Sequence, residues 1–96
     1  MEVLIAYDVA TDTPAGERRL RKVAQLCVAH GQRVQKSVFE CSLTDAQLEE
    51  LLFRLLAVID DGKDSLRVYR LREPRDRYTA IYGVRPAIDL RAPLIV

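Results

Sequence analysis

The chain has 96 residues, of which 49% are hydrophobic and 30% are charged, and its formal net charge is +1. This length and composition predict one globular domain over residues 1–96 and exclude a largely disordered chain. No stretch approaches the roughly 20 apolar residues that a membrane-spanning helix needs, and no basic leader precedes the first apolar run, so we expect a cytoplasmic protein with no membrane partner.

The first third of the chain predicts a strand followed by a helix. Residues 2–8 have the nearly continuous apolar sequence EVLIAYD, which is typical of a central strand. Thr13 followed by Pro14 indicates a helix start, and Gly31 after His30 indicates a helix end. Between these limits, apolar residues at helical spacing form one stripe, which comprises Leu20, Val23, Ala24, Cys27 and Val28.

The middle of the chain predicts β-structure and a second helix. Residues 33–43 are rich in β-branched and aromatic residues, which indicates either one long bent strand or two short strands. Thr44 and Gln47 fit a capping box at the start of the next helix. The apolar stripe of this helix comprises Leu48, Leu51, Leu52, Leu55 and Ile59.

The last third predicts further strands. Residues 65–72 and 79–84 have strand-like sequences, and a charged loop containing Pro74 joins them. Residues 86–96 end in an apolar segment interrupted by Pro93, which favours an edge strand, added to the protein's own sheet or to a partner's.

The order of these elements predicts the fold. Two amphipathic helices, each lying between strands, favour an α+β sandwich with two helices on one face of one antiparallel sheet. The common small solution of this type is the ferredoxin-like βαββαβ arrangement, here with an extra C-terminal strand.

Asp8 lies at the end of the first predicted strand, where the core meets solvent. Its carboxylate could cap backbone amides in the turn before the helix. Alternatively it could bind a hard cation such as Mg²⁺, which prefers oxygen ligands and activates phosphodiesters. One carboxylate is a small ligand set, and a dimer that brings two copies of Asp8 together would double it. The two cysteines and the single histidine lack the spacing of a zinc site.

The charges are segregated along the chain. Residues 17–36 hold six basic residues against one acidic residue, and residues 65–85 hold six against two. Residues 44–64 reverse this balance, with six acidic residues against two basic ones. The pattern fits a protein that binds a polyanion on one side, and it fits equally well solvated faces that have no partner.

Three segments together resemble a known family. The first is Tyr7-Asp8-Val9, the second is RRLRKVA at residues 18–24, and the third is GQRVQKSVFEC at residues 31–41. In this order and spacing they closely resemble the CRISPR-associated protein two family, the small subunit of the spacer-acquisition machinery. The resemblance covers the whole chain. It implies a ferredoxin-like homodimer in which residues 86–96 pair with the sheet of the partner protomer.

The resemblance also implies an activity and its residues. It implies a metal-dependent endonuclease that cleaves single-stranded RNA or double-stranded DNA, with Mg²⁺ as cofactor and Asp8 as the catalytic and metal-binding acid. Phe39 matches a structural position of the family's motif. The residues that we expect to bind nucleic acid on this basis are Tyr7, Arg18, Arg19 and Arg33.

The same resemblance implies a second role that needs no cleavage. In the spacer-integration complex the small dimer binds duplex DNA and bridges two dimers of the CRISPR integrase subunit. We expect this bridging to be the physiological role, with endonuclease activity intrinsic to the protein. The alternative is a purely non-catalytic DNA-binding scaffold. A ferredoxin-like domain that binds a small regulatory ligand would instead show no salt-sensitive binding of nucleic acid.

Overall fold

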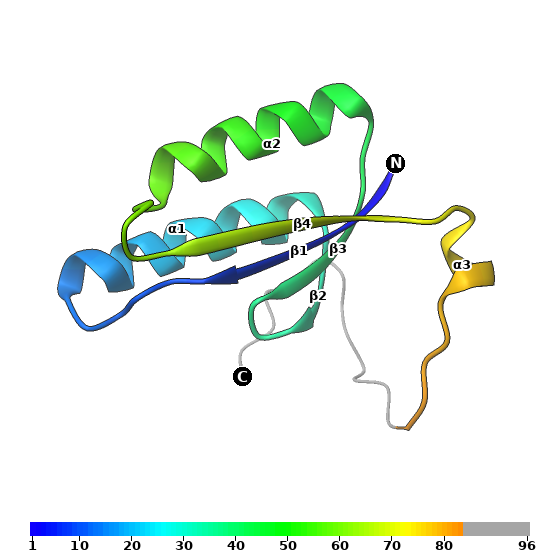
Figure 1. Cartoon of the computed structure of the whole chain (residues 1–96), viewed down its shortest axis with the longest axis horizontal. Helices are drawn as coiled ribbons and strands as arrows, with labels where there is room; N and C mark the ends of the chain where they lie inside the picture. The colour runs from blue at the N-terminus through cyan, green and yellow to red at the C-terminus, as the bar shows by residue number, and fades with distance from the viewer. Residues whose placement is uncertain (84–96) are drawn as a thin grey trace.

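The computed structural model describes residues 1–83 of the chain (Figure 1). The elements are β1 (Glu2–Asp8), α1 (Pro14–His30), β2 (Gln32–Gln35), β3 (Val38–Ser42), α2 (Asp45–Val58), β4 (Ser65–Leu71) and the short helix α3 (Arg75–Tyr78). The predicted C-terminal strand at residues 86–96 lies outside the described residues.

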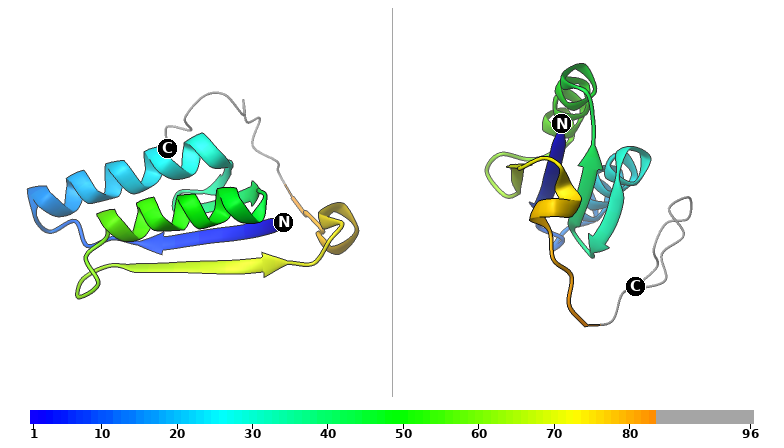
Figure 2. Two further views of the ribbon diagram at one scale, coloured as in Figure 1. Left: turned by 90° about the horizontal axis from the view of Figure 1, so that it is seen from above. Right: turned by 90° about the vertical axis from the view of Figure 1, so that its right-hand side faces the viewer.

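The four strands form one antiparallel sheet in the order β2-β3-β1-β4. Helices α1 and α2 lie on the same side of this sheet (Figure 2). The strand order and the one-sided helices confirm the predicted ferredoxin-like sandwich. We call the side of the sheet away from α1 and α2 the open face.

Local sequence signals set the ends of both main helices. The Thr13 hydroxyl accepts a hydrogen bond from the Gly16 amide at 3.1 Å, as expected of an N-cap. Thr44 and Gln47 form a complete capping box, with reciprocal bonds of 3.1 and 2.9 Å. At the other end of α1, the Gly31 amide donates to the Cys27 carbonyl at 2.9 Å, so the helix ends where the sequence predicts.

The core lies between the sheet and the two helices. Strand β1 buries every second residue, since alternate side chains of a strand point to opposite faces. The buried apolar residues comprise Val3, Ile5, Tyr7, Val9, Val23, Cys27, Phe39, Cys41, Leu43, Leu48, Leu51 and Leu55. Both cysteines are free and buried, and burial raises the pKa of the Cys27 thiol to about 12. No helix within residues 1–83 has the length and apolar character needed to cross a membrane.

The structure differs from the predicted strands, or chooses between alternatives, in two regions: residues 33–43 and residues 79–83. The region 33–43 forms two short strands joined by a turn at Lys36 and Ser37, so the single bent strand is wrong. The predicted strand at 79–84 is also wrong over its described part, because residues 79–83 are exposed and have no strand partner. A β-prone sequence needs a neighbouring backbone to pair with, and residues 75–78 form helix α3 instead of holding this segment against β4.

Candidate functional site

Tyr7 and Asp8 are neighbours in sequence but lie on opposite faces of the sheet at the end of β1. Tyr7 continues the buried series of Val3 and Ile5 on the face covered by the helices. Asp8 lies on the open face and is exposed. The first family motif therefore contributes one residue to the core and one to the solvent-facing surface.

Tyr7, Arg33 and Phe39 come together on the core side. The Tyr7 and Phe39 rings are stacked, with centroids 6.2 Å apart and an interplanar angle of 25°. Arg33 pairs with Phe39 across β2 and β3, and its guanidinium carbon lies 5.0 Å from the Phe39 ring centroid. The Tyr7 amide donates to the Ser37 carbonyl at 3.1 Å. These contacts fix the end of β1 against the β2–β3 hairpin.

Burial dominates the ionisation of Tyr7. It raises the pKa of the phenol because the charged phenolate is poorly solvated, and a hydrogen bond with Arg33 opposes this effect only in part. Tyr7 therefore stays neutral over the physiological range. The Tyr7 ring is buried and belongs to the core, so little of it is accessible to a nucleic acid.

The Asp8 carboxylate is available to an external ligand. Asp8 is opposite Ser65 in the β1–β4 register, at the end of the strand. Within residues 1–83 no protein group donates a hydrogen bond to it, so it does not cap the following turn. That part of the chain also contains no cluster of three His, Cys, Asp or Glu residues able to hold a metal ion. Asp8 is thus an exposed carboxylate that belongs to no such cluster within the described residues.

The turn after β1 is capped by Asp64 instead. The Asp64 side chain is fully buried, and its two oxygens accept from the Ala10 amide at 3.1 Å and the Asp60 amide at 2.8 Å. Arg19 donates to both oxygens, through Nε at 2.8 Å and Nη2 at 3.2 Å. These hydrogen bonds, that of Arg19 above all, lower the pKa of Asp64 to about 2.

This ion pair distinguishes two of the three arginines predicted to bind nucleic acid, Arg18 and Arg19. Arg19 is partly buried and is held in a bidentate pair by Asp64, whereas Arg18 is exposed on the first half of α1. In the sequence, Asp64 is only one member of an acidic stretch. Its partner Arg19 is 45 residues away, so no local spacing could have revealed the pair.

The open face carries two residues beside Asp8 that lie outside the three motif segments. Arg67 is opposite Ala6 and Tyr69 is opposite Leu4 in the β1–β4 register, so both share the face of Asp8. The Arg67 Nη1 donates to the Tyr69 hydroxyl at 3.3 Å. The alternation of polar and apolar residues in SLRVYRL indicates that Arg67 and Tyr69 share one face of a strand. Only the pairing of β4 with β1 shows that this is also the face of Asp8.

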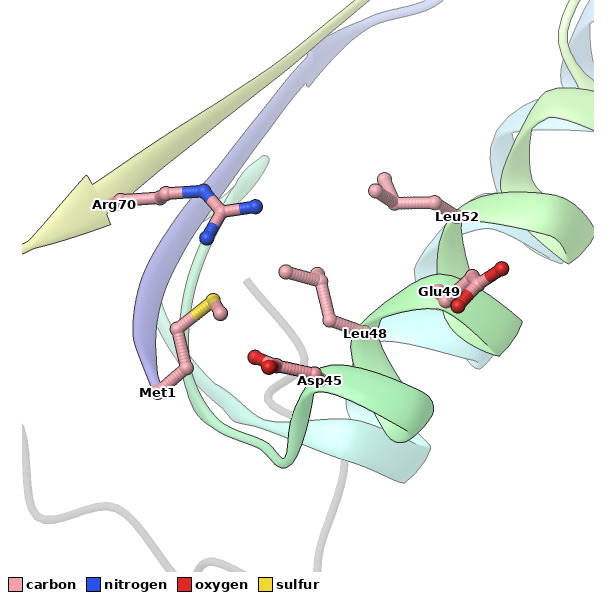
Figure 3. Close-up of a pocket in the computed structure, with 6 residues that line it drawn as sticks. All are labelled: Met1, Asp45, Leu48, Glu49, Leu52 and Arg70. Atoms are coloured by element: carbon pink, nitrogen blue, oxygen red, sulfur yellow. The ribbon is translucent and has the colours of Figure 1, made fainter.

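A small pocket lies on the other face and at the other end of the sheet. Figure 3 shows the Arg70 guanidinium directed toward α2, across from Asp45 and Leu48, with Met1 beside it. Met1 precedes β1 and Asp8 ends it, so the length of the strand separates this pocket from Asp8. The pocket is therefore not part of the site around Asp8.

Comparison with known proteins identifies a family. Residues 1–78 match the model of the family described as CRISPR associated protein Cas2. The chain is 60% identical over its full length to the whole of a CRISPR-associated endoribonuclease Cas2 from Moorella thermoacetica. It is 50% identical, over 99% of both chains, to a CRISPR-associated endonuclease Cas2 from Halalkalibacterium halodurans.

Solved structures of Cas2 proteins have a fold similar to that of this chain. Cas2 from Streptococcus pyogenes is similar with a TM-score of 0.76 and 52% identity, over 86% of this chain and 100% of that one. A chain from a partial Cas6-RT-Cas1–Cas2 complex is similar with a TM-score of 0.67 and 25% identity, over 99% of this chain and 98% of that one.

Proposed function

Because the chain belongs to the Cas2 family of CRISPR-associated proteins, we propose that it acts in CRISPR adaptation and is a nuclease. The names of its relatives as endoribonuclease and endonuclease support the nuclease assignment. The similar chain from a complex with Cas1 supports an integrase partner. In this proposal the protein is a cytoplasmic homodimer that binds duplex DNA and bridges the integrase subunits.

We further propose that Asp8 is the catalytic and metal-binding residue. The observation that carries this proposal is the exposed Asp8 carboxylate on the open face, with no hydrogen-bond donor from residues 1–83. Such a carboxylate fits Mg²⁺, which keeps several waters and typically takes one or two protein carboxylates together with phosphate oxygens. When bound, Mg²⁺ would supply Lewis-acid activation of the phosphodiester and of water.

The remaining motif residues divide into two roles in this proposal. Tyr7, Arg33 and Phe39 hold the end of β1 from the core side, so they position Asp8. Arg18 is exposed and can bind a backbone phosphate. Arg19 stabilises the turn after β1 through Asp64.

The test is cleavage by the purified protein and two isosteric variants. Labelled single-stranded RNA and duplex DNA are incubated with wild type, Asp8→Asn or Asp12→Asn, each with Mg²⁺ or with EDTA. Asp12 is a matched control, because it is another exposed acid just after β1. We expect Asp8→Asn to lower the rate roughly 100-fold or more, as EDTA does, and Asp12→Asn to cleave like wild type.

A non-catalytic scaffold is the second candidate function. The observation that favours it is the solitary position of Asp8, since residues 1–83 of one chain offer no metal-binding cluster. A wild-type protein that binds duplex DNA in a salt-dependent way, yet cleaves neither substrate, would establish this alternative. Cleavage that survives in Asp8→Asn would show that Asp8 is not the catalytic ligand.

A further inference from the structure

We propose that the groove between α1 and α2 is a docking site for an amphipathic helix of a partner protein, one that carries acidic residues beside its apolar stripe. The groove has a volume of about 470 Å³, and within the described part of the chain its lining comes from these two helices. Both helices lie on the side of the sheet opposite Asp8 (Figure 2). The inference therefore goes beyond the proposed nuclease and its catalytic residue.

The lining of the groove is mostly apolar and follows the helical period. Leu26 and Ala29 contribute from α1, and Phe53, Ala57 and Val58 contribute from α2. The lining positions 22, 25, 26, 29 and 30 of α1 are three or four residues apart, so they share one face of that helix. A groove bounded along its length by two helix faces suits a third helix, which binds through apolar side chains at the same spacing.

Phe53 is an aromatic side chain that the core of the protein does not use. The buried residues of α2 are Leu48, Leu51 and Leu55, which face the sheet and α1. Phe53 lies outside this stripe and is 76% exposed, at the edge of the groove. A large exposed apolar side chain beside an apolar groove is typical of a binding surface, and aromatic residues often dominate the affinity of such surfaces.

The charges around the groove select an acidic partner. Lys22 and Arg54 carry the fixed charges of the lining, and none of the described residues that line the groove is a carboxylate. Lys22 is exposed and has no ion-pair partner within residues 1–83. Arg54 is paired with Glu50 at 3.0 Å, but both side chains are more than half exposed, so a second carboxylate can approach. A helix with flanking acidic residues is complementary to this rim, and a basic helix is repelled by it.

The same observations favour a protein helix over the other polyanionic partners. A nucleic acid would contact the two cations through its phosphates but has no apolar stripe to cover Phe53 and fill the groove. A surface that binds an anionic membrane is a convex apolar face that enters the lipid, whereas this apolar surface is a groove between two helices. Apolar lining and basic rim together match one amphipathic, acidic helix.

Binding of designed peptides to the full chain tests the groove. The probe is a fluorescently labelled synthetic helix of about four turns, with Leu and Phe along one face and Glu beside them. One control peptide has Lys in place of Glu, and another has the acidic composition in shuffled order. Affinities are measured by fluorescence anisotropy, and circular dichroism confirms that each protein variant is folded.

Two pairs of protein variants separate the groove from its surroundings. Phe53→Ser is matched by Leu56→Ser, because Leu56 is also an exposed apolar residue of α2, at 57%, but does not line the groove. Lys22→Glu is matched by Arg21→Glu, because Arg21 is an exposed basic residue of α1 outside the lining. Each pair makes the same kind of change inside and outside the proposed site.

We expect wild type to bind the acidic helix about tenfold more tightly than either control peptide. Phe53→Ser should weaken this binding about tenfold, and Lys22→Glu should weaken it about fivefold while improving binding of the Lys-bearing peptide. Leu56→Ser and Arg21→Glu should stay within about twofold of wild type. Equal affinity for the three peptides, or equal losses within either pair of variants, would overturn the docking site. Binding of duplex DNA or anionic vesicles that is lost in Phe53→Ser, without binding of the acidic helix, would overturn the choice of partner.

Discussion

Substituting Asp64 by Asn should destabilise the protein more than any exposed charge substitution. The two Asp64 oxygens each accept one backbone amide and one Arg19 nitrogen. An asparagine presents one oxygen and one NH₂ group, so two of these donors face another donor and Arg19 loses its counter-charge. Breaking a buried, hydrogen-bonded ion pair of this kind costs about 3 kcal/mol, which corresponds to a fall in Tm of about 15 °C for a chain of this size.

Thermal unfolding followed by circular dichroism at pH 7 measures this effect. Glu50→Gln is the matched control, because Glu50 and Arg54 form an ion pair at 3.0 Å whose side chains are 64% and 58% exposed. Such an exposed pair contributes roughly 0.5 kcal/mol, so the control should change Tm by only about 2 °C. Equal Tm values for Asp64→Asn and wild type would refute the assignment of Asp64 as the structural anchor of the turn.

The pH dependence gives a second test of the same ion pair. The folded-state pKa of Asp64 is lowered from 3.8 to about 2, mainly by the hydrogen bond from Arg19. The stabilisation is therefore fully present above pH 3.8 and is lost as the pH falls through about 2. The difference in stability between wild type and Asp64→Asn should shrink across this range. A difference that is unchanged at the acid end would contradict the proposed origin of the effect.

Two further predictions concern the ionisation of Tyr7 and the assembly of the protein. Burial raises the pKa of Tyr7, so spectrophotometric titration should show one tyrosine ionising late, and Tyr7→Phe should abolish that late transition while the protein stays folded. An unchanged titration curve would contradict the burial of Tyr7. Truncation after Pro86 removes the proposed partner-pairing strand and should weaken dimerisation, measured by sedimentation at low micromolar concentration. A truncated protein that stays fully dimeric there would refute the strand exchange.

The sequence was sufficient to predict the elements whose signals are local. The Thr13 and Thr44 caps and the helix end at Gly31 depend on residues within one or two turns, and all are observed. The apolar stripe of each helix required only the helical period. The nearly continuous apolar run at residues 2–8 likewise predicted a central strand, and β1 lies between β3 and β4. These signals do not depend on how distant segments meet.

The parts that the sequence did not reveal depend on long-range pairing. Asp64 captures Arg19 from a distant part of the chain, and Arg67 shares a face with Asp8 only because β4 pairs with β1 in one register. The segment 79–83 shows the converse, since its sequence favours a strand but no described backbone pairs with it. Strand formation and charge pairing both need a partner that spacing alone does not identify.

The first family motif combines two requirements in adjacent residues. A shift of β1 by one residue would exchange its faces, placing Asp8 in the core and Tyr7 in solvent. The stacking of Tyr7 on Phe39, with Arg33 over the same ring, opposes this shift because it would expose an aromatic side chain and bury a carboxylate. The core-side residues thus secure the register that presents Asp8 on the open face. Substitutions at Tyr7 or Phe39 should therefore alter activity by displacing Asp8, without removing its carboxylate.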